Sequence, residues 1–130
     1  MRNKFFGTGE PGYHPIRKIK VCMEGIYCAT RFDFSFAYKL FLSIGVLIIC
    51  FVLRQWIDFF FILTATALVL MAELFNSAIE ALCDFIETKE NPKIKVIKDI
   101  SASAVGICIL LWVTIISVEC IRLWHLFTRT

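Results

Sequence analysis

Three long apolar segments constrain this chain more than any other feature of its sequence. Residues 34–53, 59–72 and 100–118 together contain a single charged side chain, that of Lys39. An apolar stretch of about 20 residues has the length that an α-helix needs to cross a bilayer. These segments take up most of the 130 residues, and 58% of the chain is hydrophobic, so no room remains for a separate soluble domain. We therefore expect an all-α membrane protein whose chemistry is carried by the membrane helices themselves.

Charges and turn-forming residues set the expected ends of the spanning helices. The predicted spans are at about residues 34–53, 57–87 and 99–122. The second would continue out of the membrane towards its end, where Asn91 and Pro92 break it. Arg54 to Asp58 would form a tight connection between the first two spans. Lys39 would snorkel towards the headgroups from near the end of the first span.

The segment before the first span predicts a helix on the membrane surface. Residues 1–14 are rich in glycine and predict a flexible lead, and Pro15 suits the first turn of a helix. Over residues 15–32, apolar side chains recur at helical spacing with Lys and Arg between them, which is typical of a basic amphipathic helix. This layout does not fit a cleavable signal peptide, so we expect the N-terminus to be retained. Residues 15–130 would then form one membrane domain.

The distribution of Lys and Arg predicts the orientation. Six precede residue 34 and four lie between Cys83 and Asp99, against one in the first connection and two, Arg122 and Arg129, at the C-terminal end. By the positive-inside rule, the N-terminus and the second connection are cytoplasmic, in a multi-pass protein of the bacterial inner membrane. The six cysteines form no CxxC pair, and the two histidines lack partners at ligand spacing. We expect reduced, structural thiols and no zinc or haem site.

Polar residues on the predicted second helix form the main candidate site. Their spacing keeps all of them on one face of a helix of about 3.6 residues per turn. They are Glu73, Asn76, Glu80, Asp84 and Glu87. Glu73 and Asn76 directly follow an apolar run, where an ionisable group is costly and usually serves a function. Asp84 and Glu87 fit a solvated helix face equally well.

The residue types on this face suit a metal and phosphate groups. Mg²⁺ takes oxygen ligands and commonly uses one or two carboxylates together with substrate phosphates. Lys98 and Asp99 follow the break at Pro92, and a basic group there can neutralise phosphate oxygens. The chain has no GxxxxGK[ST] motif, so phosphate binding would not be of the P-loop kind.

The motif at these positions resembles that of a known family. The sequence reads Glu73-Leu-Phe-Asn76-Ser-Ala-Ile-Glu80, followed by Asp84, then Lys98-Asp99 and a run of small residues. It is similar to the pattern ExxNxAIE, then D, then KD of the prokaryotic diacylglycerol kinase and undecaprenol kinase family. The resemblance covers roughly residues 12–125. It implies an ATP-dependent lipid kinase that uses Mg²⁺ and assembles as a homotrimer.

The resemblance also implies roles for individual residues. Glu73 would be the general base for the lipid hydroxyl, and Asn76 would orient that hydroxyl. The nucleotide and its phosphates would contact Asn76, Glu80, Asp84, Lys98 and Asp99. Mg²⁺ would be held by Glu80 and by Asp33, which is one methylene shorter than the Glu usual in the family.

Alternative functions remain open at the level of the sequence. Diacylglycerol is the favoured acceptor, and undecaprenol is the alternative within the family. A small membrane transporter would need an isolated carboxylate near the middle of the bilayer, whereas these acids run from the interface into the cytosol. A scaffold protein would not explain an amide between two acids at one-turn spacing.

The assignment of Glu80 to the metal gives the first prediction. Glu80→Gln should weaken the use of Mg²⁺ and ATP far more than the use of lipid, because the variant loses an anionic oxygen ligand. The measurement is the kinase rate against Mg²⁺, ATP and lipid concentration in turn. Unchanged apparent affinity and rate for Mg²⁺ and ATP would remove Glu80 from this role.

Overall fold

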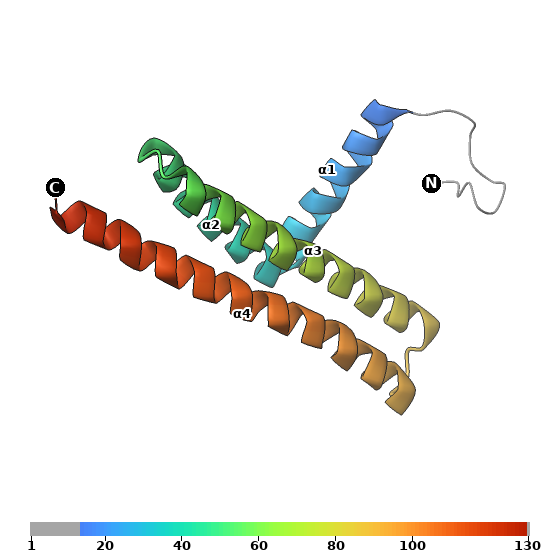
Figure 1. The fold of residues 1–130 in the computed structure, drawn as a ribbon. Coiled ribbons are helices and arrows are strands. Elements are labelled where there is room, and N and C mark those ends of the chain that lie inside the picture. Colours follow the sequence, from blue (N-terminus) through green and yellow to red (C-terminus); the bar gives the residue numbers. More distant parts are fainter. Residues whose placement is uncertain (1–13, 130) are drawn as a thin grey trace.

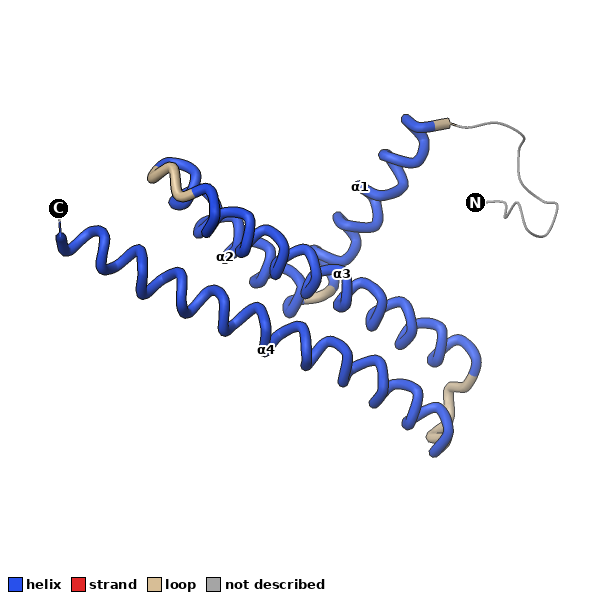
Figure 2. Tube along the Cα trace, in the orientation of Figure 1, coloured by secondary structure: helices blue, strands red, loops and turns tan. Residues whose placement is uncertain are grey.

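The computed structural model describes residues 14–129, which fold into four helices (Figure 1). The helices are α1 (Pro15–Phe32), α2 (Phe34–Val52), α3 (Trp56–Ile86) and α4 (Pro92–Arg129). The described residues contain no β-strand (Figure 2), so the expectation of an all-α fold is confirmed. Helices α2, α3 and α4 are each long and apolar enough to cross a membrane. The lead predicted over residues 1–14 lies outside the described residues, except for His14.

Helices α2 and α4 both pack against α3. Helices α3 and α4 run side by side, α2 packs on α3, and α1 points away from this group and contacts α2 (Figure 1). Apolar side chains from all three long helices form the core, including Cys50, Ile62, Val69 and Trp112. The Trp112 indole N–H donates to the buried Ser43 hydroxyl at 3.0 Å, which joins α4 to α2. Helices α2 and α4 therefore contact each other directly as well as through α3.

The first connection is shorter than the sequence predicts. Helix α3 begins at Trp56, so only residues 53–55 reverse the chain between α2 and α3. The turn is this tight because Arg54 adopts a positive φ of 54° and the Gln55 N–H donates to the Cys50 carbonyl at 2.9 Å. Asp58, expected in the connection, lies instead in the first turn of α3.

Helix α4 extends beyond the predicted third span at both ends. It starts at Pro92, as the predicted break requires, and so begins before the apolar run that starts at residue 100. The Asn91 side chain accepts a hydrogen bond from the Lys93 N–H at 3.0 Å, and its backbone carbonyl accepts from the Lys95 N–H at 3.0 Å. These contacts satisfy donors of the first helical turn, so the helix forms in the basic segment and carries Lys98 on its first turns.

Most large apolar side chains of the long helices face outwards in the single chain. Phe41 is 63% exposed on α2, Phe60 is 61% exposed on α3, and Leu110 is 71% exposed on α4. A soluble protein rarely exposes so much contiguous apolar surface. The same surface is favourable in contact with lipid tails or with other apolar helices, which fits a membrane protein.

A buried ionic cluster joins α3 to α4 at the end away from the α3–α4 connection. Asp58 is 1% exposed, and its Oδ1 pairs with the Arg122 guanidinium at 2.6 Å. The same guanidinium lies 3.4 Å from the buried Glu119 carboxylate, while Asp58 Oδ2 has no hydrogen-bond partner among the described residues. Arg122 therefore provides the principal compensation for two buried acids.

Arg122→Met tests this cluster. The change should lower the free energy of unfolding by about 2–3 kcal/mol, because it leaves Asp58 buried without its charged partner. The double variant Arg122→Met/Asp58→Asn should recover most of this loss. Denaturant unfolding in detergent micelles measures the effect, with the exposed Arg129→Met on the same helix as the control. Equal stabilities of the Arg122 and Arg129 single variants would contradict the interpretation.

Candidate functional site

Asp33 lies at the junction of three helices. Its backbone N–H donates to the Ala29 carbonyl at 2.8 Å and so closes α1, while its Oδ1 accepts from the Phe36 N–H at 3.2 Å and caps α2. Its second oxygen, Oδ2, accepts from the Ser77 hydroxyl of α3 at 3.1 Å. Asp is among the preferred N-cap residues because its short carboxylate reaches the free N–H groups of the first turn. One side chain thus sets how α2 leaves α1 and where it meets α3.

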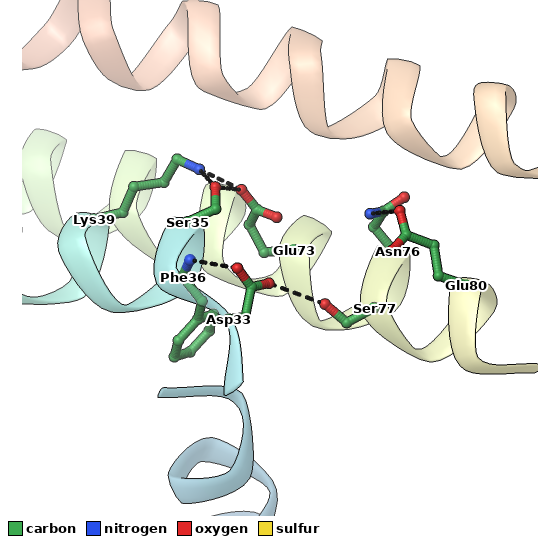
Figure 3. Close-up of polar contacts among 8 residues, drawn as sticks. All are labelled: Asp33, Ser35, Phe36, Lys39, Glu73, Asn76, Ser77 and Glu80. Carbon is green, nitrogen blue, oxygen red and sulfur yellow. Dashed lines mark hydrogen bonds and ion pairs between the residues drawn. The ribbon is translucent and has the colours of Figure 1, made fainter. Parts of the chain in front are cut away.

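Glu73 is the deepest of the predicted site residues. It is 5% exposed, although it directly follows the uncharged apolar run of residues 59–72. Its Oε1 accepts a hydrogen bond from the Ser35 hydroxyl at 2.8 Å and forms an ion pair with the ammonium group of Lys39 (Figure 3). Both partners come from α2, so the carboxylate of α3 is held from the neighbouring helix.

The prediction that Lys39 snorkels to the headgroups is wrong. Its side chain is completely buried in the protein. The Lys39 Nζ lies 2.5 Å from the Ser35 hydroxyl and also donates to Glu73 Oε1. A lone cation within an apolar run is compatible with snorkelling or with a partner inside the protein, and its position in the sequence does not separate the two. The partner itself lies 34 residues away and needs the packing of α2 on α3.

Asn76 and Glu80 continue the site along α3. The Asn76 side-chain amide donates to Glu80 Oε1 at 2.9 Å (Figure 3), and its carbonyl oxygen accepts from the Ser101 hydroxyl of α4 at 2.6 Å. Ser101 is buried, Asn76 is half-buried and Glu80 is exposed. The line of polar groups therefore runs from the interior at Glu73 to solvent at Glu80. Ser35, Ser77 and Ser101 were not identified from the sequence, because serine hydroxyls carry no spacing signal.

The outer residues of the site are more accessible. The Lys98 ammonium pairs with Asp84 Oδ1 at 2.5 Å across α4 and α3, with the two side chains 34% and 68% exposed. The Asp99 side chain is exposed and forms no hydrogen bond or ion pair with the described residues. Glu87 does not continue the predicted helical face, because α3 ends at Ile86 and the Glu87 side chain accepts from the Lys89 N–H at 3.1 Å.

The carboxylates suit a metal that is shared with a substrate. Among residues 14–129, no three His, Cys, Asp or Glu side chains are close enough to enclose an ion. Glu80 is exposed and is engaged on one oxygen only, by Asn76. Asp33 contacts α3 at Ser77, three residues before Glu80 (Figure 3). Mg²⁺ usually binds one or two carboxylates and completes its shell with phosphate oxygens and water. Glu80, with one oxygen free of contacts to the described residues, fits this ion, whereas both Asp33 oxygens already accept hydrogen bonds.

Comparison with known families decides the family of the chain. A family model described as prokaryotic diacylglycerol kinase matches residues 20–119. The chain belongs to this family. The match covers more than half of the chain and spans every candidate residue from Asp33 to Asp99. None of the curated proteins compared with the chain matches it significantly. The resemblance based on the motif is thus confirmed, and membership supports a lipid-kinase activity.

Asp33 gives a prediction that separates a metal ligand from a helix cap. Asn is also a good N-cap, so Asp33→Asn keeps the cap but removes the charge. If Asp33 binds Mg²⁺, this variant should lose about tenfold or more of its kinase rate at limiting Mg²⁺, whereas Asp33→Glu should retain or increase activity. The measurement is the steady-state rate against Mg²⁺ concentration.

Ser77→Ala is the matched control for the Asp33 variants. It removes the hydrogen bond to Asp33 Oδ2 without changing any charge, so its Mg²⁺ dependence should stay close to that of the wild type. Near-equal curves for all four proteins would leave Asp33 with the capping role alone.

Proposed function

We propose that the chain transfers the γ-phosphoryl group of ATP to the hydroxyl of a membrane lipid, with diacylglycerol as the favoured acceptor and phosphatidic acid as the product. The observation that carries the proposal is the Glu73 carboxylate, which is buried at the inner end of a polar face and engaged through Oε1 alone. Membership of the prokaryotic diacylglycerol kinase family supports the same reaction class.

Glu73 is proposed as the general base. Oε1 is occupied by Ser35 and Lys39, and Oε2 accepts no hydrogen bond from the described residues. An acceptor hydroxyl beside Oε2 gives up its proton to that oxygen, while its own oxygen forms the new bond to the γ-phosphorus and the bond to the bridging oxygen of ADP breaks. The amide of Asn76 lies one turn further along α3, where it orients the acceptor. Phosphoryl transfer needs mainly such positioning, with little covalent work from the protein.

The phosphates are proposed to lie at the outer half of the site. Glu80 and Asp33 would hold Mg²⁺, which would neutralise charge on the oxygens of the transferring group. Lys98 is well placed to contact phosphate oxygens, because its ammonium lies at the aqueous end of the polar face and is partly exposed. Asp84 orients that ammonium, and Asp99 would contact the nucleotide from the following position.

The proposed setting is the bacterial inner membrane with the N-terminus and the α3–α4 connection in the cytoplasm. The basic residues before residue 34 and around that connection support this orientation. Glu73 would then meet the hydroxyl of a lipid that arrives by lateral diffusion, and α1 would lie along the surface. The exposed apolar faces of α2, α3 and α4 support self-association, and we propose a homotrimer.

Undecaprenol is the second candidate acceptor, since it also presents a primary hydroxyl at the interface. The direct test incubates the purified protein with labelled ATP and Mg²⁺ and with either diacylglycerol or undecaprenol. Label in phosphatidic acid supports the favoured acceptor, and label in undecaprenyl phosphate supports the alternative. Absence of label in both lipids would contradict the proposed activity.

Glu73→Gln tests the general base. The amide keeps the shape of the side chain but cannot accept the proton, so turnover per folded molecule should fall by about 10²-fold or more. The folded state should also lose stability, because the buried Lys39 ammonium loses its charged partner. The matched control is Glu119→Gln, which makes the same change at another buried glutamate at the opposite end of the helices. Turnover of the Glu73 variant at the wild-type level would exclude this residue as the base.

A further inference from the structure

Lys39 is a buried cation for which the proposed reaction has no use so far. Its side chain is 0% exposed and lies within an α2 segment that has no other charged residue. A buried ion pair is weak evidence for stability, because apolar residues of similar volume often stabilise a protein equally well or better. Within a membrane helix the same pair usually marks a functional site. The presence of Lys39 therefore calls for a role beyond packing α2 against α3.

The geometry of the pair restricts one oxygen of Glu73. Lys39 and Ser35 are one helical turn apart on α2, and both contact Glu73 Oε1. The Lys39 ammonium also donates to the Ser35 hydroxyl at 2.5 Å, so the three groups form a closed triangle (Figure 3). A carboxylate with two fixed contacts on one oxygen cannot rotate freely about its last torsion. Its other oxygen, Oε2, is therefore held in one direction.

We propose that Lys39 is a positioning residue, which together with Ser35 holds Glu73 Oε1 so that Oε2 faces the acceptor hydroxyl. This proposal rests on the function proposed above and adds how the base is aligned. Lys39 keeps its own protons throughout, and the hydroxyl proton passes to Oε2 alone. Alignment of a base within its productive geometry has a large effect on rate, because small displacements of reacting groups are costly. The alignment comes from α2, although the base itself lies on α3.

The decisive experiment is a double-mutant cycle between Lys39 and Glu73. Lys39→Met should lower kcat by about 10²-fold while the KM for ATP changes little, because the base is misaligned and the nucleotide contacts are intact. Glu73→Gln should lower kcat to a similar level. If Lys39 acts through Glu73, the double variant should be no slower than Glu73→Gln alone. Multiplied losses of about 10⁴-fold would instead show that Lys39 acts independently, which would overturn the proposal.

Two further variants keep the test decisive if Lys39→Met fails to fold. Ser35→Ala removes one of the two contacts on Oε1 and should lower kcat by about fivefold, again with little change in the KM for ATP. Lys39→Arg keeps the charge and should recover part of the activity that Lys39→Met loses. The proposal would be contradicted if Ser35→Ala has the wild-type kcat and the kcat of Lys39→Arg is no higher than that of Lys39→Met.

Ser43→Ala separates positioning from general packing. Ser43 lies one turn after Lys39 on α2, is equally buried and accepts from Trp112 of α4 rather than from Glu73. Loss of the Ser43 hydroxyl should lower the melting temperature of the protein but leave kcat near the wild-type value. A kcat as low in Ser43→Ala as in Lys39→Met would assign Lys39 a purely structural role. Wild-type turnover of Glu73→Gln would instead reject the proposed base, so the two failures remain distinguishable.

Discussion

The contact on which this structure depends is the buried ion pair between Lys39 of α2 and Glu73 of α3. Either charge alone would be very costly inside a membrane helix, so each residue requires the other in place. The pair therefore fixes the depth at which α2 meets α3. It also fixes where the polar face of α3 begins, because Glu73 is its innermost member. The Asn76 and Glu80 contacts follow outwards from that point along the same helix.

Polar contacts hold the long helices at both ends, while apolar packing fills the middle. At one end, Asp33 caps α2 and reaches Ser77, and Ser101 of α4 reaches Asn76. At the other end, Arg122 of α4 pairs with Asp58 of α3. Helix–helix association in a bilayer gains little from the hydrophobic effect, since lipid tails are as apolar as the side chains. Hydrogen bonds and ion pairs at defined positions therefore decide the register of α2, α3 and α4.

Residues close in the sequence could be predicted to share the site, and distant partners could not. The spacing of Glu73, Asn76 and Glu80 follows from helical geometry, and the structure puts them along one helix from the interior to solvent. The end of α3 at Ile86 removed Glu87 from this face, because the chain stops being helical one residue earlier than predicted. The burial of Lys39 was missed, since snorkelling and pairing cannot be told apart without knowing which helix packs beside α2.

The sequence by itself determined the all-α class, the three helices long and apolar enough to cross a membrane, the break at Pro92 and the family, because apolar length, helical period and motif spacing are local properties. Only the tertiary structure decided that Ser35 and Lys39 share Glu73 Oε1, that Asp33 caps α2 while contacting Ser77, and that Asp58 is buried against Arg122. Each of these contacts joins residues from different helices. Their partners are selected by how the helices pack, which is set by the whole set of buried side chains rather than by any one segment.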